Sequence, residues 1–417
     1  MSQHEFSGAW HGNQGLGRRE FLAGSAMVAA AMAGGSGASR AVEGEAAERK
    51  VKLGIVGCGG RGLWIARLFR DHGGYEIHAV ADYFQEVANA AGGELKVASS
   101  RCFSGLAGYR RLIDSGVEAV ALETPPCFFP EHIQASVDAG LHVFVAKPVA
   151  IDVPGCRQVE ASAKKAAEQQ QCFLVDYQMP TDPHVIECAE RFRAGALGNL
   201  SMVKSFYYGG LFGDPPLTDT IESRLRSLVW VNDTAIGGSY HVNACIHPIQ
   251  AMMWVLDKVP VAAAGISSTR RTNPHGDSHD TFGITYEFDD GLLWTHTGRH
   301  ARGLTGPEDP LATCEFLGDA YMRIGYGGRA LIRGGSHHYP GGSIDNLYAA
   351  GAIRNIATFY QDVVAGNVAN ETVRMAIDSC LATILARDAC LRKGYMTMDE
   401  LLQENRRIEP DLTGLKA

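Results

Sequence analysis

Two side chains that can move protons stand at chemically unusual places in this sequence. Lys147 ends the apolar run "LHVFVA" and is followed directly by Pro148. Burying an ammonium group is costly unless the group is paired or used, so Lys147 is a candidate reacting group, the alternative being a lysine that extends into solvent. His247 lies in the apolar stretch "NACIHPIQAMMWVL", one helical turn after Asn243. Imidazole titrates near neutrality, so His247 can donate or accept a proton unless it is a packed core histidine.

A glycine-rich turn offers a binding site for a dinucleotide. The segment "GIVGCGGRG" places Gly57, Gly59 and Gly62 after an apolar strand and at the start of a helix. In this spacing the first glycine permits the tight turn, the second lets a pyrophosphate approach, and the third lets helix and strand pack closely. Asp82 ends the next strand, where a carboxylate binds ribose hydroxyls and repels a 2′-phosphate. The pattern predicts NAD rather than NADP. We expect Arg61 to reach phosphate or adenine, or to lie exposed at the helix start.

Alternating strands and helices must position these groups. Between about residues 46 and 176, strand-like runs such as "KLGIVG" and "YEIHAVAD" alternate with helical runs, which predicts βαβ units and a parallel sheet. The run "VEAVALET" leads into Thr124 and Pro125, at the carboxyl edge where open α/β sheets bind ligands. Lys147 lies on the same edge. Tyr177, which follows "FLVD", is expected to contact substrate there.

The second half of the chain has a different pattern. Strand-like runs alternate with Gly- and Asp-rich turns, and "EFDDGLLW" carries the Asp-Gly signal of a hairpin. Two helical stretches follow, and "GGSHHYPGG" between them and the strands is expected to be a loop. Residues 221–235 read as an insertion over the pocket. The sequence thus predicts an α/β Rossmann dinucleotide-binding domain at 46–176, an α+β domain with a large, mostly antiparallel sheet at 177–400, and a tail at 401–417.

The first 45 residues resemble a twin-arginine export signal. Arg18 and Arg19 precede an Ala/Gly-rich apolar segment that closes on the small-residue pattern Ser39-Arg40-Ala41, a candidate cleavage site. The alternative is an N-terminal tail without a targeting role. We expect the twin-arginine export machinery as a partner and a periplasmic or otherwise exported location.

Composition excludes several functions. The net charge is −8 and no basic run occurs beyond the first residues, which argues against binding to nucleic acid or to an anionic membrane. The sequence contains no run of about 18 apolar residues, so no membrane span is predicted. None of the ten cysteines forms a C-x-x-C pair. His241, Asn243 and His247 match no metal-ligand signature and have no acidic neighbour, so no metal site is predicted.

The motifs "GIVGCGGRG", "AD", "TPP…H" and "GLHVFVAKPVA", in this order, resemble the Gfo/Idh/MocA oxidoreductase family, which includes glucose–fructose oxidoreductase and inositol dehydrogenases. The family pattern "GKHVxxEKP" matches at Lys147, with Ala146 in place of its Glu. A second family motif, Gly-Gly, Asp and then His, matches "GGSYHVNACIH", with Asn243 in place of the Asp. The resemblance implies that Lys147 stabilises charge on the reacting hydroxyl, His247 transfers its proton and Asn243 holds a substrate hydroxyl.

The resemblance also implies the overall function. We expect an exported NAD(P)-dependent oxidoreductase that transfers hydride between nicotinamide and a sugar, polyol or keto-sugar. Because no free nicotinamide pool is expected outside the cytoplasm, the cofactor should stay tightly bound. The alternatives are an NAD-dependent glycosidase or epimerase that acts through a transient keto-sugar, and a non-catalytic carbohydrate-binding relative. The antiparallel sheet resembles the surface through which the family forms homodimers or homotetramers.

Overall fold

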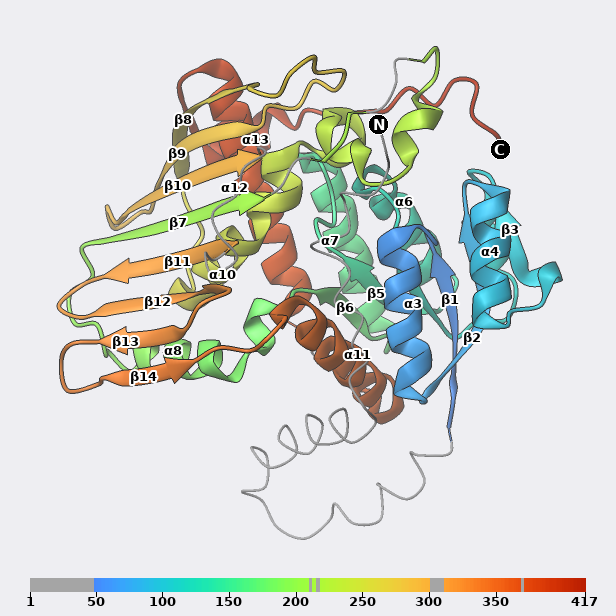
Figure 1. Ribbon diagram of the computed structural model, residues 1–417, viewed down its shortest axis with the longest axis horizontal. Coiled ribbons are helices and arrows are strands. Elements are labelled where there is room, and N and C mark those ends of the chain that lie inside the picture. The colour runs from blue at the N-terminus through green and yellow to red at the C-terminus, as the bar shows by residue number, and fades with distance from the viewer. Residues whose placement is uncertain (1–48, 210–211, 215–217, 301–310, 369–370) are drawn as a thin grey trace, which may run out of the picture. The chain divides into compact units, whose positions relative to one another are not determined.

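The computed structural model describes residues 49–417, apart from residues 210–211, 215–217, 301–310 and 369–370 (Figure 1). The predicted export signal lies outside the described residues. Among the described residues, no helix combines the length and the apolar character needed to cross a bilayer. The boundaries predicted near residues 45, 176 and 400 stay predictions.

The first part of the described chain is a parallel sheet covered by helices. Its strands are β1 (Val51–Val56), β2 (Tyr75–Asp82), β3 (Cys102–Ser104), β4 (Ala119–Leu122), β5 (His142–Ala146) and β6 (Phe173–Asp176). Their order is β3-β2-β1-β4-β5-β6, and every pair is parallel. The connecting helices are α3 (Gly60–His72), α4 (Gln85–Leu95), α5 (Gly108–Ile113), α6 (Phe129–Asp138) and α7 (Val153–Glu168). This strand order creates a crevice between the ends of β1 and β4, where the crossover direction reverses.

A second, larger sheet follows. It contains β7 (Met202–Gly209), β8 (Ala262–Ser268), β9 (Thr281–Glu287), β10 (Leu293–His300), β11 (Ala312–Leu317), β12 (Tyr321–Tyr326), β13 (Ala330–Arg333), β14 (Tyr339–Gly342) and β15 (Tyr395–Thr397). Their order is β14-β13-β12-β11-β7-β10-β9-β8-β15. Within the described residues β7 and β10 pair in parallel and the other neighbours are antiparallel. The segment predicted as the loop "GGSHHYPGG" contributes strand β14, while His337 and His338 lie in the turn before it.

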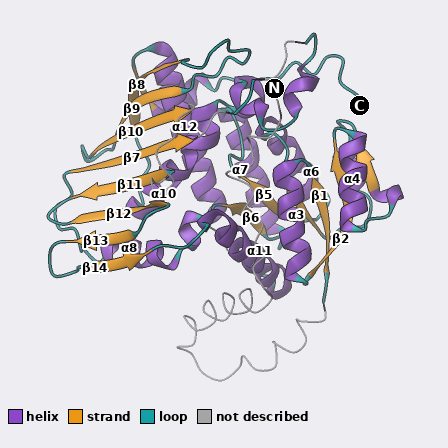
Figure 2. Cartoon of the chain, in the orientation of Figure 1, coloured by secondary structure: helices purple, strands orange, loops and turns teal. Residues whose placement is uncertain are grey.

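The remaining helices follow the first sheet in the chain (Figure 2). They are α8 (Pro183–Arg193), α9 (Thr234–Gly237), a π-helix (His241–Cys245), α10 (Ile246–Leu256), α11 (Leu347–Ala365), α12 (Thr372–Arg392) and α13 (Met398–Glu404). Short 3₁₀ turns span Ser99–Arg101, Pro126–Phe128, Met179–Thr181, Ile221–Leu225 and Val229–Asn232.

Helix α12 holds the two sheets against each other, and helix α11 packs on the first sheet. Helix α11 runs back to α3, and its residues Ile356 and Phe359 join the buried cluster around Phe69 and Phe144 on the first sheet (Figure 1). Helix α12 contacts β6 and α7 on one side and β8 and α10 on the other. The carboxyl ends of the parallel strands and the helix α10 are thereby held in one region of the fold.

Candidate active site

The glycine turn after β1 has the shape that a dinucleotide pyrophosphate requires. Gly57 has a φ of +90°, and a Cβ on it would lie 2.7 Å from the backbone carbon of Glu123. A Cβ on Gly62 would lie 1.8 Å from the carbonyl oxygen of Gly57, so helix and turn touch there. Above Gly59, in contrast, a Cβ meets nothing within 4 Å, and α3 begins without a side-chain cap. The open space at an uncapped helix start fits a phosphate group.

Asp82 is held at the end of β2 by backbone N–H groups. Its Oδ2 accepts the N–H of Cys58 at 2.8 Å, and its Oδ1 accepts the N–H of Phe84 at 3.0 Å. Burial raises the pKa of Asp82, while these N–H groups and the charge of Arg226 oppose that rise. A carboxylate oxygen accepts more than one hydrogen bond, so both oxygens can still receive ribose hydroxyls. The geometry fits the adenosine end of NAD.

Two distant segments hold the loop that follows Asp82. The hydroxyl of Tyr83 donates to Oε1 of Glu222 at 2.8 Å and accepts the backbone N–H of Lys416 at 3.1 Å. The guanidinium of Arg226 lies 3.5 Å from the ring centroid of Phe84. The predicted insertion at 221–235 therefore contacts the first sheet next to Asp82. Sequence reasoning missed Arg226 because nothing local links it to the loop after β2.

Lys147 sits at the end of β5, before a cis bond to Pro148, and points toward the π-helix. Its Nζ donates to the backbone carbonyl of Asn243 at 2.8 Å. Burial and the positive charge of Arg61 together lower the pKa of Lys147 to about 7, against the opposing carboxylates of Asp176 and Glu123. A lysine with this pKa is present both as amine and as ammonium near neutral pH.

A cluster of buried charges surrounds Lys147. Arg61 forms ion pairs with Asp176 (Nη2 to Oδ2, 2.5 Å) and Glu123 (Nε to Oε2, 2.8 Å) and also donates to the hydroxyl of Tyr348. Burial raises the pKa of Glu123 to about 7, although Arg61 opposes it. The guanidinium of Arg61 is thus paired with two carboxylates of the protein, and its contact with the cofactor stays a prediction.

Sequence reasoning missed Glu123 and Asp176, although the signal that singled out Lys147 applies to them. Asp176 ends the apolar strand β6, and Glu123 directly follows the apolar strand β4. A second carboxylate oxygen of Asp176 accepts from the side chain of Asn355 at 2.7 Å. An ionisable residue at the end of a buried strand is costly and so indicates a functional role.

His247 is oriented by a tyrosine. Its Nδ1 lies 3.2 Å from the hydroxyl of Tyr326, which donates to Oε1 of Gln178 at 2.8 Å. Because that hydroxyl has a single proton, it accepts Nδ1–H from His247 and leaves Nε2 as the proton acceptor. Burial lowers the pKa of His247 well below its ordinary value, and Lys147 and Arg61 lower it further, so the ring is neutral at neutral pH. Lys147, Asn243 and His247 thus meet in one place.

The other predicted site residues have defined protein partners. The hydroxyl of Tyr177 lies 3.0 Å from Oγ of Ser379 on α12, and Tyr177 is buried. Oγ1 of Thr124 lies 3.4 Å from Nδ1 of His132. Pro125 caps the short 3₁₀ turn after β4. The contacts of these three residues with ligands stay predictions.

Comparison with known proteins identifies both halves of the chain. Residues 51–177 match the model of the oxidoreductase family with an NAD-binding Rossmann fold, and residues 185–318 match the GFO/IDH/MocA C-terminal domain. Inositol 2-dehydrogenase 3 of Saccharopolyspora erythraea is 27% identical over 225 residues, which cover 54% of this chain and 58% of that relative. The scyllo-inositol 2-dehydrogenase (NAD(+)) of Bacillus subtilis is 24% identical over 253 residues, which cover 56% of this chain and 70% of that relative. The chain therefore spans somewhat over half the length of the first of these relatives.

Solved structures share the fold over nearly all of the described residues. An aldose-aldose oxidoreductase from Caulobacter crescentus, complexed with glycerol, has a TM-score of 0.67 at 19% identity, covering 84% of this chain and 100% of its own. A scyllo-inositol dehydrogenase from Lactobacillus casei, with bound NAD(H) and scyllo-inositol, also has a TM-score of 0.67, at 15% identity, with the same two coverages. The predicted fold class and the predicted NAD cofactor are confirmed. The chain belongs to the Gfo/Idh/MocA oxidoreductase family and carries its NAD-binding Rossmann domain followed by its C-terminal domain.

Proposed function

We propose that this protein is an exported NAD-dependent oxidoreductase that oxidises or forms a secondary hydroxyl group on a cyclic polyol or sugar. The observation that carries the proposal is the meeting of Lys147, Asn243 and His247 beside the dinucleotide turn. The names of the relatives, inositol dehydrogenases above all, support a ring that bears several hydroxyls.

Bound NAD supplies the acceptor for the hydride that leaves the substrate carbon. His247 accepts a hydrogen bond, through Nε2, from a substrate hydroxyl next to the reacting one, because Tyr326 leaves that ring nitrogen unprotonated. Lys147 in its amine form takes the hydroxyl proton, and in the reverse reaction its ammonium form returns it. Its pKa of about 7 suits both steps near neutrality, whereas the low pKa of His247 favours a positioning role over proton storage. Asn243 binds a neighbouring hydroxyl.

Contacts around the loop after Asp82, which would bind the adenosine end, support retention of the cofactor. Glu222, Arg226 and Lys416 come from two segments far from β2 in sequence, and all three contact the loop after Asp82. Release of NAD requires these contacts to open, which slows dissociation. Slow dissociation is useful to an exported enzyme, since the twin-arginine route carries folded proteins with their cofactors.

A homodimer or homotetramer fits the exposed face of the second sheet. Ile266 on β8, Leu293 on β10 and Tyr395 on β15 are 70%, 50% and 58% exposed. The pairing registers place all three on the same face of the sheet. Burying such side chains against a second copy is favourable.

The test of catalysis uses full-length protein purified from the exported fraction and dialysed extensively. NAD content is measured first, and then the near-ultraviolet band of reduced nicotinamide is followed while inositols, aldoses and their keto forms are added. Retained NAD that one polyol reduces supports the proposal. Retained NAD with release of a sugar from a glycoside, and no net reduction, would favour the glycosidase. Protein that neither retains NAD nor turns over with NAD added would overturn the proposal.

The test of export compares the wild type with a variant in which Arg18 and Arg19 are both replaced by lysine. We expect the wild type in the periplasm with a shortened N-terminus and the variant in the cytoplasm at full length. Equal distribution of the two proteins would contradict the export proposal without affecting the catalytic one.

A further inference from the structure

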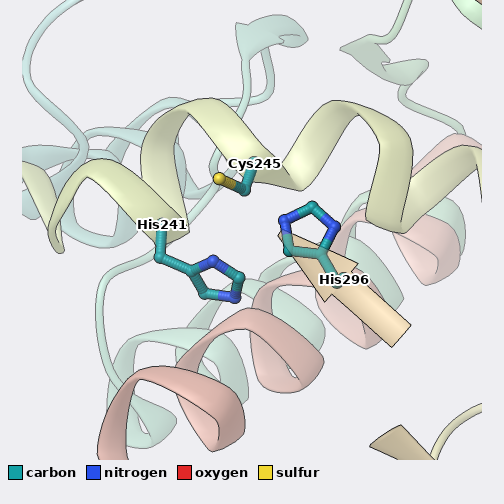
Figure 3. A group of neighbouring side chains, drawn as sticks. All are labelled: His241, Cys245 and His296. Atoms are coloured by element: carbon teal, nitrogen blue, oxygen red, sulfur yellow. The ribbon is translucent and has the colours of Figure 1, made fainter. Parts of the chain in front are cut away.

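Two histidines and a cysteine form a fully buried cluster next to the candidate active site. His241 and Cys245 are one turn apart on the π-helix, and His296 reaches them from β10 (Figure 3). One nitrogen or sulfur atom of each lies within 4.8 Å of the other two, and all three side chains have no exposed surface. None of the three takes part in the proposed reaction.

The hydrogen bonds around His241 leave its Nδ1 unprotonated, with a free lone pair inside the cluster. Its Nε2 lies 3.2 Å from the hydroxyl of Tyr286, which donates to the carbonyl of Ala382 at 3.2 Å. That hydroxyl therefore accepts Nε2–H, and Nδ1 of His241 is unprotonated. Nδ1 is buried and has no hydrogen-bond partner in the described structure. A buried acceptor without a partner is costly and needs an explanation.

His296 presents a second such atom. Its Nδ1 lies 2.8 Å from Oγ of Ser205, and its Nε2 is buried without a partner among the described residues. Oγ of Ser205 already accepts the indole N–H of Trp294 at 2.8 Å and has one further lone pair for Nδ1–H of His296. A cation at Nε2 would select that tautomer. Histidines that bind metals are commonly fixed in this way, by a hydrogen bond at the other ring nitrogen.

The fold leaves room for the sulfur of Cys245. Gly298, two residues after His296 on β10, faces the thiol, and a Cβ there would lie 2.7 Å from Sγ of Cys245. The same Cβ would lie 3.8 Å from Nε2 of His296. A glycine at this position therefore keeps the space between thiol and imidazole open.

We propose that Nδ1 of His241, Sγ of Cys245 and Nε2 of His296 bind one monovalent copper ion. Thiolate and imidazole are donors that soft first-row cations prefer, and Cu⁺ is satisfied by three of them. With bond lengths of roughly 2.0–2.3 Å, the three donor atoms would lie roughly 3.5–3.8 Å from one another. They now lie within 4.8 Å of one another, so the side chains would have to move closer by about 1 Å at most. Binding displaces the thiol proton to solvent.

The charge of the site favours Cu⁺ over Zn²⁺. One thiolate and two neutral imidazoles neutralise Cu⁺, whereas Zn²⁺ would leave a positive charge in a dry interior. Zinc also prefers four ligands, and the cluster offers three His, Cys, Asp or Glu side chains among the described residues.

The site would help to position the catalytic lysine. The π-helix that supplies His241 and Cys245 also supplies the carbonyl of Asn243 that receives Nζ of Lys147. A metal that ties this helix to β10 would hold that carbonyl in place. The sequence predicted no metal because His296 lies far along the chain and only the folded strand brings it near.

The test adds Cu⁺ to full-length protein without oxygen, in competition with a coloured Cu⁺ chelator, and adds Zn²⁺ in a parallel sample. Elemental analysis after gel filtration gives the stoichiometry, and X-ray absorption at the copper edge gives the donor atoms. We expect one copper per chain with one sulfur and two nitrogen donors. Cys245→Ala and His296→Ala should weaken binding at least about tenfold. Cys188→Ala, which removes an equally buried thiol on α8, should leave binding unchanged.

Unfolding temperature gives a second readout that does not depend on activity. Cu⁺ should raise it for the wild type and for Cys188→Ala but not for Cys245→Ala. No bound copper in the wild type, or equal binding by Cys245→Ala, would overturn the proposal. Zn²⁺ bound in preference by the same three residues would overturn the assignment to copper.

Discussion

Replacing Lys147 by methionine should inactivate the protein and at the same time stabilise its fold. The ammonium form of Lys147 is disfavoured in the folded state, since burial lowers its pKa from 10.5 to about 7. At about 1.36 kcal/mol per pH unit this difference corresponds to about 5 kcal/mol. Methionine fills a similar volume and carries no charge, so the variant escapes this cost.

The sign and the pH window follow from proton linkage. The unfolded chain binds the Lys147 proton more tightly, so the wild type gains stability as pH rises from about 7 to about 10.5. The variant should thus have its largest advantage at or below pH 7 and lose it near pH 10.5. The lost hydrogen bond to the carbonyl of Asn243 opposes the gain by about 1–3 kcal/mol. The net stabilisation expected near pH 7 is about 2–4 kcal/mol.

Urea unfolding of cofactor-free protein at about pH 6.5, 8.5 and 10 measures this difference. Lys164→Met is the matched control, because Lys164 lies exposed on α7 and its replacement should change stability by less than about 0.5 kcal/mol. In parallel, kcat/KM should fall about 10²–10⁴-fold in Lys147→Met alone. A Lys147→Met protein that is less stable than the wild type at pH 6.5, or a difference that does not change with pH, would refute the reasoning.

Four further variants test the cofactor turn and the orientation of His247. Gly59→Ala should weaken NAD binding in calorimetric titration without lowering the free energy of unfolding, because its Cβ would enter the open space above the turn. Gly62→Ala should lower the free energy of unfolding, because its Cβ would lie 1.8 Å from the carbonyl oxygen of Gly57. Asp82→Ala should raise the affinity for NADP relative to NAD in the same titration, and an unchanged ratio would argue against ribose binding by Asp82. Tyr326→Phe should lower kcat/KM about 2–10-fold at unchanged NAD affinity, since His247 loses the acceptor that fixes its tautomer, and an unaltered rate would mean that the hydroxyl has no such role.

The sequence predicted the elements whose pattern repeats over several residues. Strands β1, β2, β4, β5 and β6 are mostly apolar runs of four to eight residues, and their alternation with helices predicted a parallel sheet. Strand β3 has three residues and α5 has six, too few for a periodic signal to emerge. Contacts between segments far apart in the sequence could not be predicted either. The pairing of Arg61 with Asp176 and the approach of His296 to Cys245 depend on which strand ends and which register become neighbours in the fold.

Ala146 and Asn243, the two departures from the family pattern, do not remove the electrostatics that the chemistry needs. Ala146 pairs in register with Asp176 on β6, whose carboxylate, together with that of Glu123, raises the pKa of Lys147. Two carboxylates from the strands on either side of β5 therefore place negative charge near the lysine. Asn243 acts on Lys147 through its backbone carbonyl, which any residue would offer, so the loss of a carboxylate there leaves that contact intact. An apolar residue would be more stable than a lysine at this buried position, so the presence of Lys147 supports the proposed catalytic role over the non-catalytic alternative.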